Sequence, residues 1–149
     1  MLRISGIFLE KCCLCATFCL SLFVKFEDMD ALFRKHDRLL ANTSMKIIRE
    51  KMDQIHWNAR IVSIMGPKGV GKSTLIKQYI KQNFQAGDRT VLYCSADTVD
   101  FSTRTLVGLA EEFHIHGGEL LAVDEIHKYK PGTMDWSREV KEIYELFPT

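Results

Sequence analysis

Residues 66–74 constrain this chain more than any other stretch, because they read Gly-Pro-Lys-Gly-Val-Gly-Lys-Ser-Thr. The run matches G-x-x-x-x-G-K-S/T, a pattern in which glycines let backbone N–H groups turn inward around an anion. Residues 60–65, just before it, are rich in β-branched side chains and predict a buried strand, and residues 74–80 have helical spacing. A strand, a glycine loop and a helix in this order predict a phosphate-binding loop (P-loop). The alternative is a glycine turn before a helix whose lysine only faces solvent.

Each residue type in this loop has a predicted role in holding a nucleotide. The start of the following helix adds unpaired N–H groups and the positive end of the helix dipole. Lys72 is placed to reach the β- and γ-phosphates, and Ser73 to offer its hydroxyl to Mg²⁺. The predicted nucleotide-binding residues are Gly66, Pro67, Lys68, Gly69, Val70, Gly71, Lys72, Ser73 and Thr74.

Two adjacent carboxylates, Asp124 and Glu125, follow the apolar run at residues 120–123. In open parallel sheets the carboxyl ends of the strands border the crevice where ligands bind. We therefore predict that Asp124 holds Mg²⁺ through a water, together with Ser73, and that Glu125 is the general base. With Lys72, Glu125 forms the predicted catalytic pair. The alternative is two solvated carboxylates at the start of a loop.

The residues around this acidic pair favour ATP over GTP as the nucleotide. Ras-type GTPases have Asp-x-x-Gly after this strand, whereas here Asp124 is followed by Glu125, Ile126 and His127. The guanine-reading motif Asn-Lys-x-Asp does not occur in the sequence. The expected chemistry is therefore Mg²⁺-dependent ATP hydrolysis.

Strand-like and helical patterns alternate along the chain. Strands are predicted at residues 60–65, 90–95 and 119–123, and helices at residues 73–84, 106–113 and 136–147. This alternation implies right-handed crossovers and a parallel sheet, so the predicted fold is an α/β P-loop NTPase with a three-layer core and about three strands. Two further helices are predicted between residues 29 and 57, with a break at residues 41–44. Gly87 is the predicted C-terminal cap of the helix that follows the loop.

Residues 1–28 differ in composition from residues 29–149, which we assign to one partial ATPase domain. Residues 12–24 are apolar apart from small hydroxyls, but this run is too short to span a bilayer as a helix. Three interpretations stay open: an extension with no structural role, a signal or membrane element, and a helix packed on the domain. Four cysteines lie here without paired zinc-site spacing, and we expect reduced thiols in a cytoplasmic protein: Cys12, Cys13, Cys15 and Cys19.

The charge balance argues for neither nucleic acid nor a membrane surface as a partner. Lys and Arg number 20 and Asp and Glu 19, which gives a formal net charge of +1. A protein that binds nucleic acid or an acidic membrane surface usually carries a basic patch, and no basic, aromatic-rich stretch occurs here. A DNA-associated helper ATPase therefore has no support from the sequence, and ATP is the expected partner.

Two stretches near the C-terminus resemble a known family. Residues 121–129 read Leu-Ala-Val-Asp-Glu-Ile-His-Lys-Tyr, and residues 135–144 read Asp-Trp-Ser-Arg-Glu-Val-Lys-Glu-Ile-Tyr. Together they resemble the prokaryotic AAA-type ATPases in which an ATPase core precedes a C-terminal domain of unknown function. The resemblance covers about residues 30–149.

This resemblance implies roles for individual residues. It implies nucleotide binding by Gly66, Gly71, Lys72, Ser73 and Thr74, Mg²⁺ and catalytic roles for Asp124 and Glu125, and the formation of homo-oligomers. His127 and Trp136 also match the family pattern. His127 either senses the γ-phosphate or packs the loop.

The resemblance also implies parts that this sequence does not contain. In such ATPases a strand with a polar sensor follows the helix that begins at Trp136, and it lies between the P-loop strand and the strand before Asp124. The sequence ends at Thr149, where that strand would begin. We therefore expect a truncated chain with an apolar slot in its sheet, weak nucleotide binding and little or no turnover. The alternatives to an ATPase are a non-catalytic nucleotide-binding or interaction module and an inactive fragment.

Overall fold

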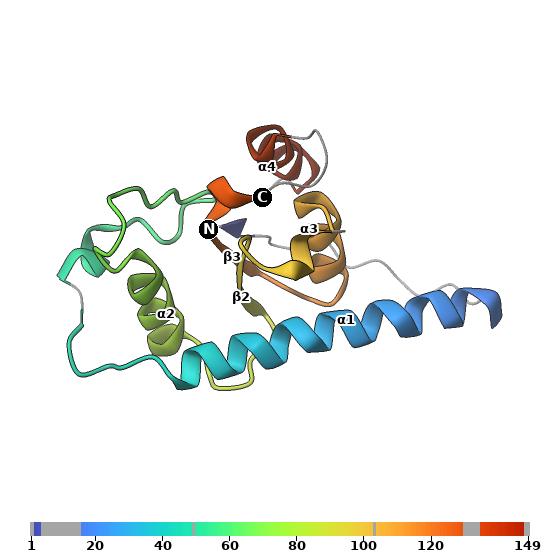
Figure 1. Cartoon of the computed structure of the whole chain (residues 1–149), viewed down its shortest axis with the longest axis horizontal. Helices are drawn as coiled ribbons and strands as arrows, with labels where there is room; N and C mark the ends of the chain where they lie inside the picture. Colours follow the sequence, from blue (N-terminus) through green and yellow to red (C-terminus); the bar gives the residue numbers. More distant parts are fainter. Residues whose placement is uncertain (1, 4–15, 49, 103, 130–134, 148–149) are drawn as a thin grey trace.

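The computed structural model describes residues 2–3, 16–48, 50–102, 104–129 and 135–147. Figure 1 shows its strands and helices in sequence colours. They are β1 (Leu2–Arg3), α1 (Ala16–Ala41), α2 (Lys72–Asn83), β2 (Val91–Ser95), α3 (Leu106–Ile115), β3 (Leu120–Asp124) and α4 (Trp136–Leu146). Short 3₁₀ helices lie at Glu50–Gln54, Val99–Ser102 and Ile126–Lys128.

A small sheet with the strand order β1-β3-β2 forms the centre of the molecule. β2 and β3 are parallel, and their register runs from Val91 opposite Leu120 to Ser95 opposite Asp124. The chain between them passes through α3, as the alternating pattern predicted. β1 pairs antiparallel with the other edge of β3, opposite Leu120 and Leu121.

Helices cover both faces of the sheet, with α2 on one side and α3 and α4 on the other (Figure 1). α1 runs past both of these helical layers. Because side chains alternate along a strand, each strand contributes to two separate cores. The core on the α2 side contains Ile76, Ile80, Val91, Tyr93, Leu120 and Ala122. The core on the opposite side joins residues of α1, α3 and α4 to Leu92, Cys94 and Leu121. The fold is thus the predicted three-layer α/β P-loop core with an incomplete parallel sheet.

The predicted strand at residues 60–65 does not form. Ile61 makes a single bridge, and residues 62–67 have no regular secondary structure. A strand needs a neighbouring strand for its ladder, but a cavity lies between this segment and β3. The segment is tied to α4 instead, because the Arg60 guanidinium donates to the carbonyl oxygens of Tyr144 and Phe147 at the end of that helix.

The predicted helix at residues 45–57 is replaced by a short 3₁₀ helix, Glu50–Gln54. Side chains of α2 explain this difference. The buried Gln78 amide donates to the carbonyls of Ser44 and Ile47 at 2.9 and 2.8 Å, so these carbonyls accept from a side chain. Ile48 belongs to the stripe that the helical pattern predicts to be buried, yet it is 49 % exposed. The break at residues 41–44 is confirmed, because α1 ends at Ala41.

Two predicted helix ends also shift. The helix after the P-loop ends at Asn83 with Phe84 as its cap, and Gly87 adopts a positive φ in the turn that follows. α1 begins at Ala16, upstream of Met29. Together with β1, this start gives residues 2–3 and 16–28 defined backbone structure, which differs from the interpretation that the extension has no structural role. Cys12, Cys13 and Cys15 lie outside the described residues, and the side chain of Cys19 is not described.

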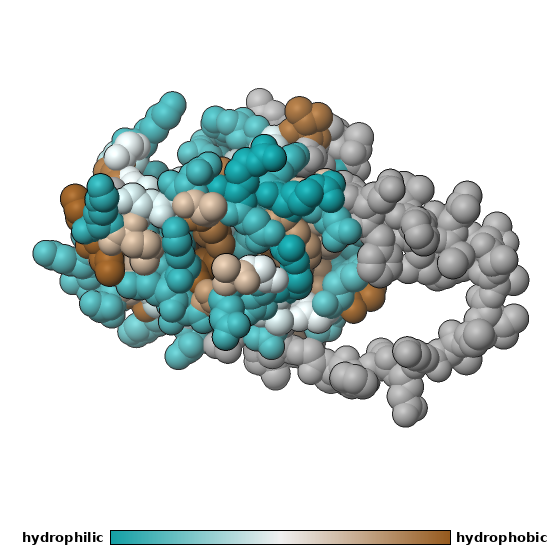
Figure 2. Space-filling view, turned by 90° about the horizontal axis from the view of Figure 1, so that it is seen from below, coloured by the Kyte–Doolittle hydropathy of each residue, from teal (hydrophilic) through white to brown (hydrophobic). Residues whose placement is uncertain are grey.

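The surface is mostly polar on the face drawn in Figure 2, where hydrophilic side chains surround scattered hydrophobic ones. Within the described residues, none of the helices has the length and apolar character that crossing a membrane requires.

His36 of α1 accepts a hydrogen bond from the outer edge of β2. Its Nδ1 accepts the backbone N–H of Tyr93 at 2.8 Å, and the side chain is only 2 % exposed. A ring nitrogen that accepts carries no proton, so the imidazole is neutral in this arrangement. Burial is the main cause that lowers the pKa of His36 below 6.5. The negative charges of Asp37 and Asp88 oppose this shift, and the positive charge of Arg89 adds to it.

We expect acid to destabilise the fold through His36. Because its pKa is lower in the folded state, the unfolded chain binds the proton first, so stability is full above pH 6.5 and falls as the pH drops through the folded pKa. The loss is at most about 1.4 kcal/mol per pH unit. Urea unfolding at about pH 7.5 and about pH 5.5 measures this loss. His36→Asn keeps an acceptor that does not titrate, so its stability should fall less over this range. An equal loss in both proteins would contradict this role.

Candidate nucleotide site

The loop at residues 66–74 has the backbone shape that its glycines predict. Gly69 and Gly71 have φ values of 86° and 91°, a left-handed conformation that other residues adopt only with strain. Gly71 is the N-cap of α2, and no side chain caps this helix end. The first turn of α2 therefore points its N–H groups and the positive end of its dipole into the loop, as an anion site requires.

Lys72 is the first residue of α2, and its ammonium group bends back over the loop. Nζ donates to the carbonyl oxygens of Gly66 and Pro67 at 2.8 and 2.9 Å. These neutral acceptors hold the charge beside the anion site. A bound phosphate would compete with these carbonyls for the Lys72 ammonium group. Its oxygen atoms are charged, and charge-assisted hydrogen bonds are stronger than those to neutral acceptors.

Asp124 lies at the end of β3, on the face of the sheet that α2 covers. One carboxylate oxygen, Oδ2, accepts from the Tyr93 hydroxyl at 2.7 Å, and Oδ1 accepts from the backbone N–H of Glu125 at 3.0 Å. Asp124, predicted from the sequence as a magnesium ligand, is thus oriented by a phenol of the neighbouring strand.

Tyr93 was not singled out as a site residue from the sequence, where it lies in the apolar run of β2. Burial raises the pKa of Tyr93, and the hydrogen bond to Asp124 and the negative charge of Asp124 raise it further. The phenol therefore keeps its proton and remains a donor. A hydroxyl-bearing ring inside a buried strand was the available signal, because a buried Tyr oxygen usually has a hydrogen-bond partner.

Glu125 follows Asp124 in a strained conformation. Its φ is 52°, the left-handed region that residues with a side chain rarely adopt outside functional sites. The carboxylate lies 3.3 Å from His127 Nε2, and the His127 side chain is 69 % exposed. The prediction that His127 packs the loop is therefore wrong, because its ring faces solvent and contacts Glu125 instead.

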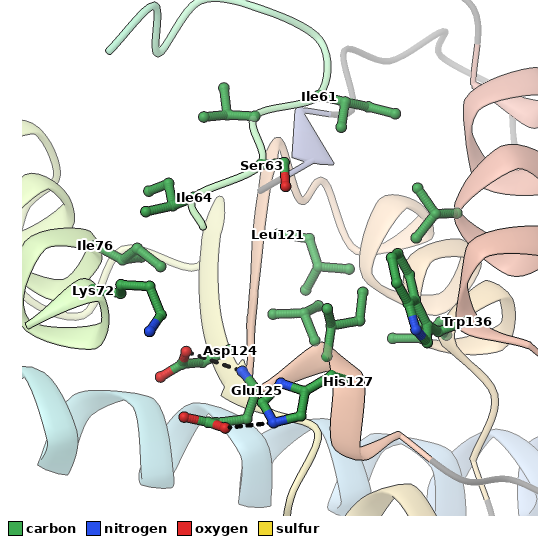
Figure 3. A pocket seen from close by; sticks show the side chains of 15 residues that line it. Ile61, Ser63, Ile64, Lys72, Ile76, Leu121, Asp124, Glu125, His127 and Trp136 are labelled. Atoms are coloured by element: carbon green, nitrogen blue, oxygen red, sulfur yellow. Dashed lines mark hydrogen bonds and ion pairs between the residues drawn. The ribbon is translucent and has the colours of Figure 1, made fainter. Parts of the chain in front are cut away.

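A cavity of about 190 Å³ opens beside these groups. Figure 3 shows Lys72 and Ile76 on one side of it, Trp136 on the other, and Asp124 and Glu125 at one end. Its apolar wall includes Ile61, Ile64, Leu121, Val123 and Val140. The cavity separates residues 61–64 from β3, so the predicted apolar slot in the sheet is present.

A buried carboxylate joins the two stretches that carry the family resemblance. Glu139 of α4 is 1 % exposed. Its Oε1 accepts from the Tyr129 hydroxyl at 2.7 Å, and its Oε2 accepts from the backbone N–H groups of Leu106 and Val107 at 2.7 and 3.2 Å. Tyr129 and Glu139 thus fix the loop after β3 and the helix α4 to the start of α3.

Comparison with known proteins identifies one family. A family model described as an AAA domain matches residues 58–149, which include the loop at residues 66–74, Asp124 and Glu125. This range is shorter than the 30–149 that the resemblance suggested. The comparisons with curated proteins and with solved structures gave no match. Because the matched region is more than half of the sequence and carries the complete loop, the chain belongs to the AAA domain family.

Proposed function

We propose that this chain binds ATP together with Mg²⁺ at residues 66–74, Asp124 and Glu125, and that Glu125 directs hydrolysis. The observation that carries the proposal is the uncapped N-terminus of α2, which opens from a glycine loop with left-handed φ values beside the acidic end of β3. Unpaired N–H groups beside two carboxylates favour a ligand that is both a polyanion and a carrier of a cation.

The phosphates would lie on the backbone of the loop. The N–H groups at the start of α2 face this position. Lys72 Nζ, held on the carbonyls of Gly66 and Pro67, is within a short side-chain rotation of the same place. Its role would be to neutralise the β- and γ-phosphates.

Ser73 and Asp124 fit a magnesium ion. Both supply hard oxygen ligands, and Mg²⁺ is usually held by one or two carboxylates with substrate phosphates and water. Within the part of the chain that is described, no three His, Cys, Asp or Glu side chains gather as a metal cluster. When bound, the ion would draw charge from the phosphates and orient them.

Glu125 would orient and deprotonate the attacking water. It lies next to Asp124 at the cavity, and its carboxylate is 33 % exposed, so water can reach it.

ATP is preferred to GTP because the GTPase motifs are missing from the sequence. Homo-oligomers and a cytoplasmic location remain proposals that rest on the family.

Glu125→Gln is the variant that separates binding from hydrolysis. We expect it to bind Mg²⁺–ATP with an affinity within about threefold of the parent, because the amide keeps the size of the side chain. The expected turnover of the parent is low, and we expect it to fall roughly 10²–10⁴-fold further, because the amide cannot accept the proton of the water. Fluorescence titration measures binding, and phosphate release measures turnover.

Asp97→Asn is a suitable control, because this carboxylate pairs with Lys128 beside the site and has no proposed role. Glu125→Gln with the parental turnover would exclude it as the base. Tight binding with no measurable turnover in the parent would favour the alternative function, a nucleotide-binding module that does not hydrolyse ATP.

A further inference from the structure

The Tyr93 hydroxyl of β2 and the Asp124 carboxylate of β3 form a hydrogen-bonded pair. Tyr93 is 4 % exposed, and its hydroxyl donates to Asp124 Oδ2 at 2.7 Å. Since a carboxylate only accepts, the phenol proton is used in this bond.

The strand register fixes the position of the phenol. Tyr93 lies opposite Ala122 in the parallel pair, and Asp124 is two residues further along β3. Residues two apart on a strand share a face, so Asp124 and Tyr93 both point toward α2. On that side Lys77 lies over the Tyr93 ring, with its Nζ 5.6 Å from the ring centroid. The ring is thus held between β3 and α2.

This direction of donation prepares Asp124 for a cation. Asp124 Oδ2 is oriented by the bond from Tyr93 and keeps further lone pairs. Groups behind the ligands of a metal commonly fix ligand orientation in this way, and their loss typically lowers metal affinity by about 10–100-fold.

We propose that Tyr93 is a positioning residue for Mg²⁺: its hydroxyl orients Asp124 so that the carboxylate presents an oxygen atom to the ion at the nucleotide site. This inference rests on the proposed function, because it needs Mg²⁺ to bind with the nucleotide. It adds a residue of β2 to a site built otherwise from the loop, α2 and the end of β3.

The test is the Mg²⁺ dependence of nucleotide binding in the full chain. A fluorescent ATP analogue is titrated in EDTA and then over a series of free Mg²⁺ concentrations. In Tyr93→Phe we expect affinity in EDTA within about twofold of the parent, and a Mg²⁺ midpoint raised roughly 10-fold. In Asp124→Asn the same Tyr93→Phe change should add little, because the carboxylate that Tyr93 orients is already lost.

Tyr129→Phe is the matched control. It also removes the hydroxyl of a buried tyrosine that donates to a carboxylate, Glu139, at 2.7 Å, but away from the loop. It should leave the Mg²⁺ midpoint unchanged. An unchanged midpoint in Tyr93→Phe, or an equal loss of affinity in EDTA and in Mg²⁺, would overturn the positioning role. A parent protein that binds no nucleotide would refute the proposed function first, whereas a parent that binds it independently of Mg²⁺ would refute only this inference.

The parent protein gives a second measurement that does not depend on how Tyr93→Phe folds. The chain has four tyrosines, and NMR of a label on the ring carbon that bears the hydroxyl gives one signal for each. Mg²⁺ bound to Asp124 would draw charge from its carboxylate and so weaken it as the acceptor of the Tyr93 hydroxyl. Adding Mg²⁺ to the nucleotide complex should therefore shift the Tyr93 signal, which the Phe variants of the other three tyrosines assign by elimination. A Tyr93 signal that does not respond would contradict the proposal.

Discussion

Replacing Glu139 with alanine is expected to lower the free energy of unfolding by about 3–5 kcal/mol, which is a large part of the roughly 5–15 kcal/mol that stabilises a typical domain. The substitution leaves three donors without their carboxylate, the hydroxyl of Tyr129 and the backbone N–H groups of Leu106 and Val107. Of these, the Leu106 N–H keeps the Tyr129 oxygen as a second acceptor at 3.0 Å. Each unsatisfied buried donor costs about 1–3 kcal/mol. It also removes a negative charge from the positive end of α3, where such a charge is favourable.

Urea unfolding followed by circular dichroism measures this loss. Glu142→Ala is the matched control, because Glu142 is exposed on the same helix, α4, and an exposed substitution usually changes stability by less than about 0.5 kcal/mol. Glu139→Gln should lie between the two, since the amide keeps one acceptor oxygen. A Glu139→Ala protein as stable as Glu142→Ala would show that the carboxylate does not hold α3 and α4 together.

Local features of the fold were predictable from the sequence because short stretches decide them. The glycines at positions 69 and 71 specify the loop whichever elements surround it. Residues 91–95 and 120–124 form strands because apolar runs of this length suit buried parallel strands. α4 begins where Asp135 caps it, and its side chain accepts from the N–H of Ser137, a local signal that sequence patterns detect well.

Elements that depend on a distant partner were not predictable. Residues 60–65 have a strand-like composition, yet no ladder forms because a cavity separates them from β3. Residues 45–57 have helical spacing, but Gln78 binds the carbonyls of Ser44 and Ile47. In both segments, tertiary contacts outweigh the local preference.

The candidate site divides in the same way. The loop, Asp124 and Glu125 were predicted by motif, and the fold brings Lys72, Asp124 and Glu125 to one cavity. Tyr93 and Glu139 were missed, because the role of each depends on partners far away in the sequence. Glu139 did carry a signal: it lies three residues after Trp136 and four before Ile143, on the apolar side of α4, where a charged residue needs a buried partner.

Lys72→Ala is expected to weaken the binding of Mg²⁺–ATP by at least about 100-fold, or ~2.7 kcal/mol. Lys72 is the one residue of the loop whose charged group already lies against the anion site, on the carbonyls of Gly66 and Pro67. Without the Lys72 ammonium group, only the backbone N–H groups of the loop would bind the negatively charged phosphates. The fold should be unaffected, because this ammonium contacts only exposed loop carbonyls.

The most direct test of the central claim is isothermal titration of Mg²⁺–ATP into the parent protein, into Lys72→Ala and into Lys141→Ala. Lys141 is a 78 % exposed lysine on α4 and controls for the loss of a positive charge. The account predicts saturable binding of one nucleotide per chain in the parent and in Lys141→Ala, and a loss of at least about 100-fold in Lys72→Ala. No binding to the parent, or equal affinities in all three proteins, would contradict a nucleotide site at residues 66–74.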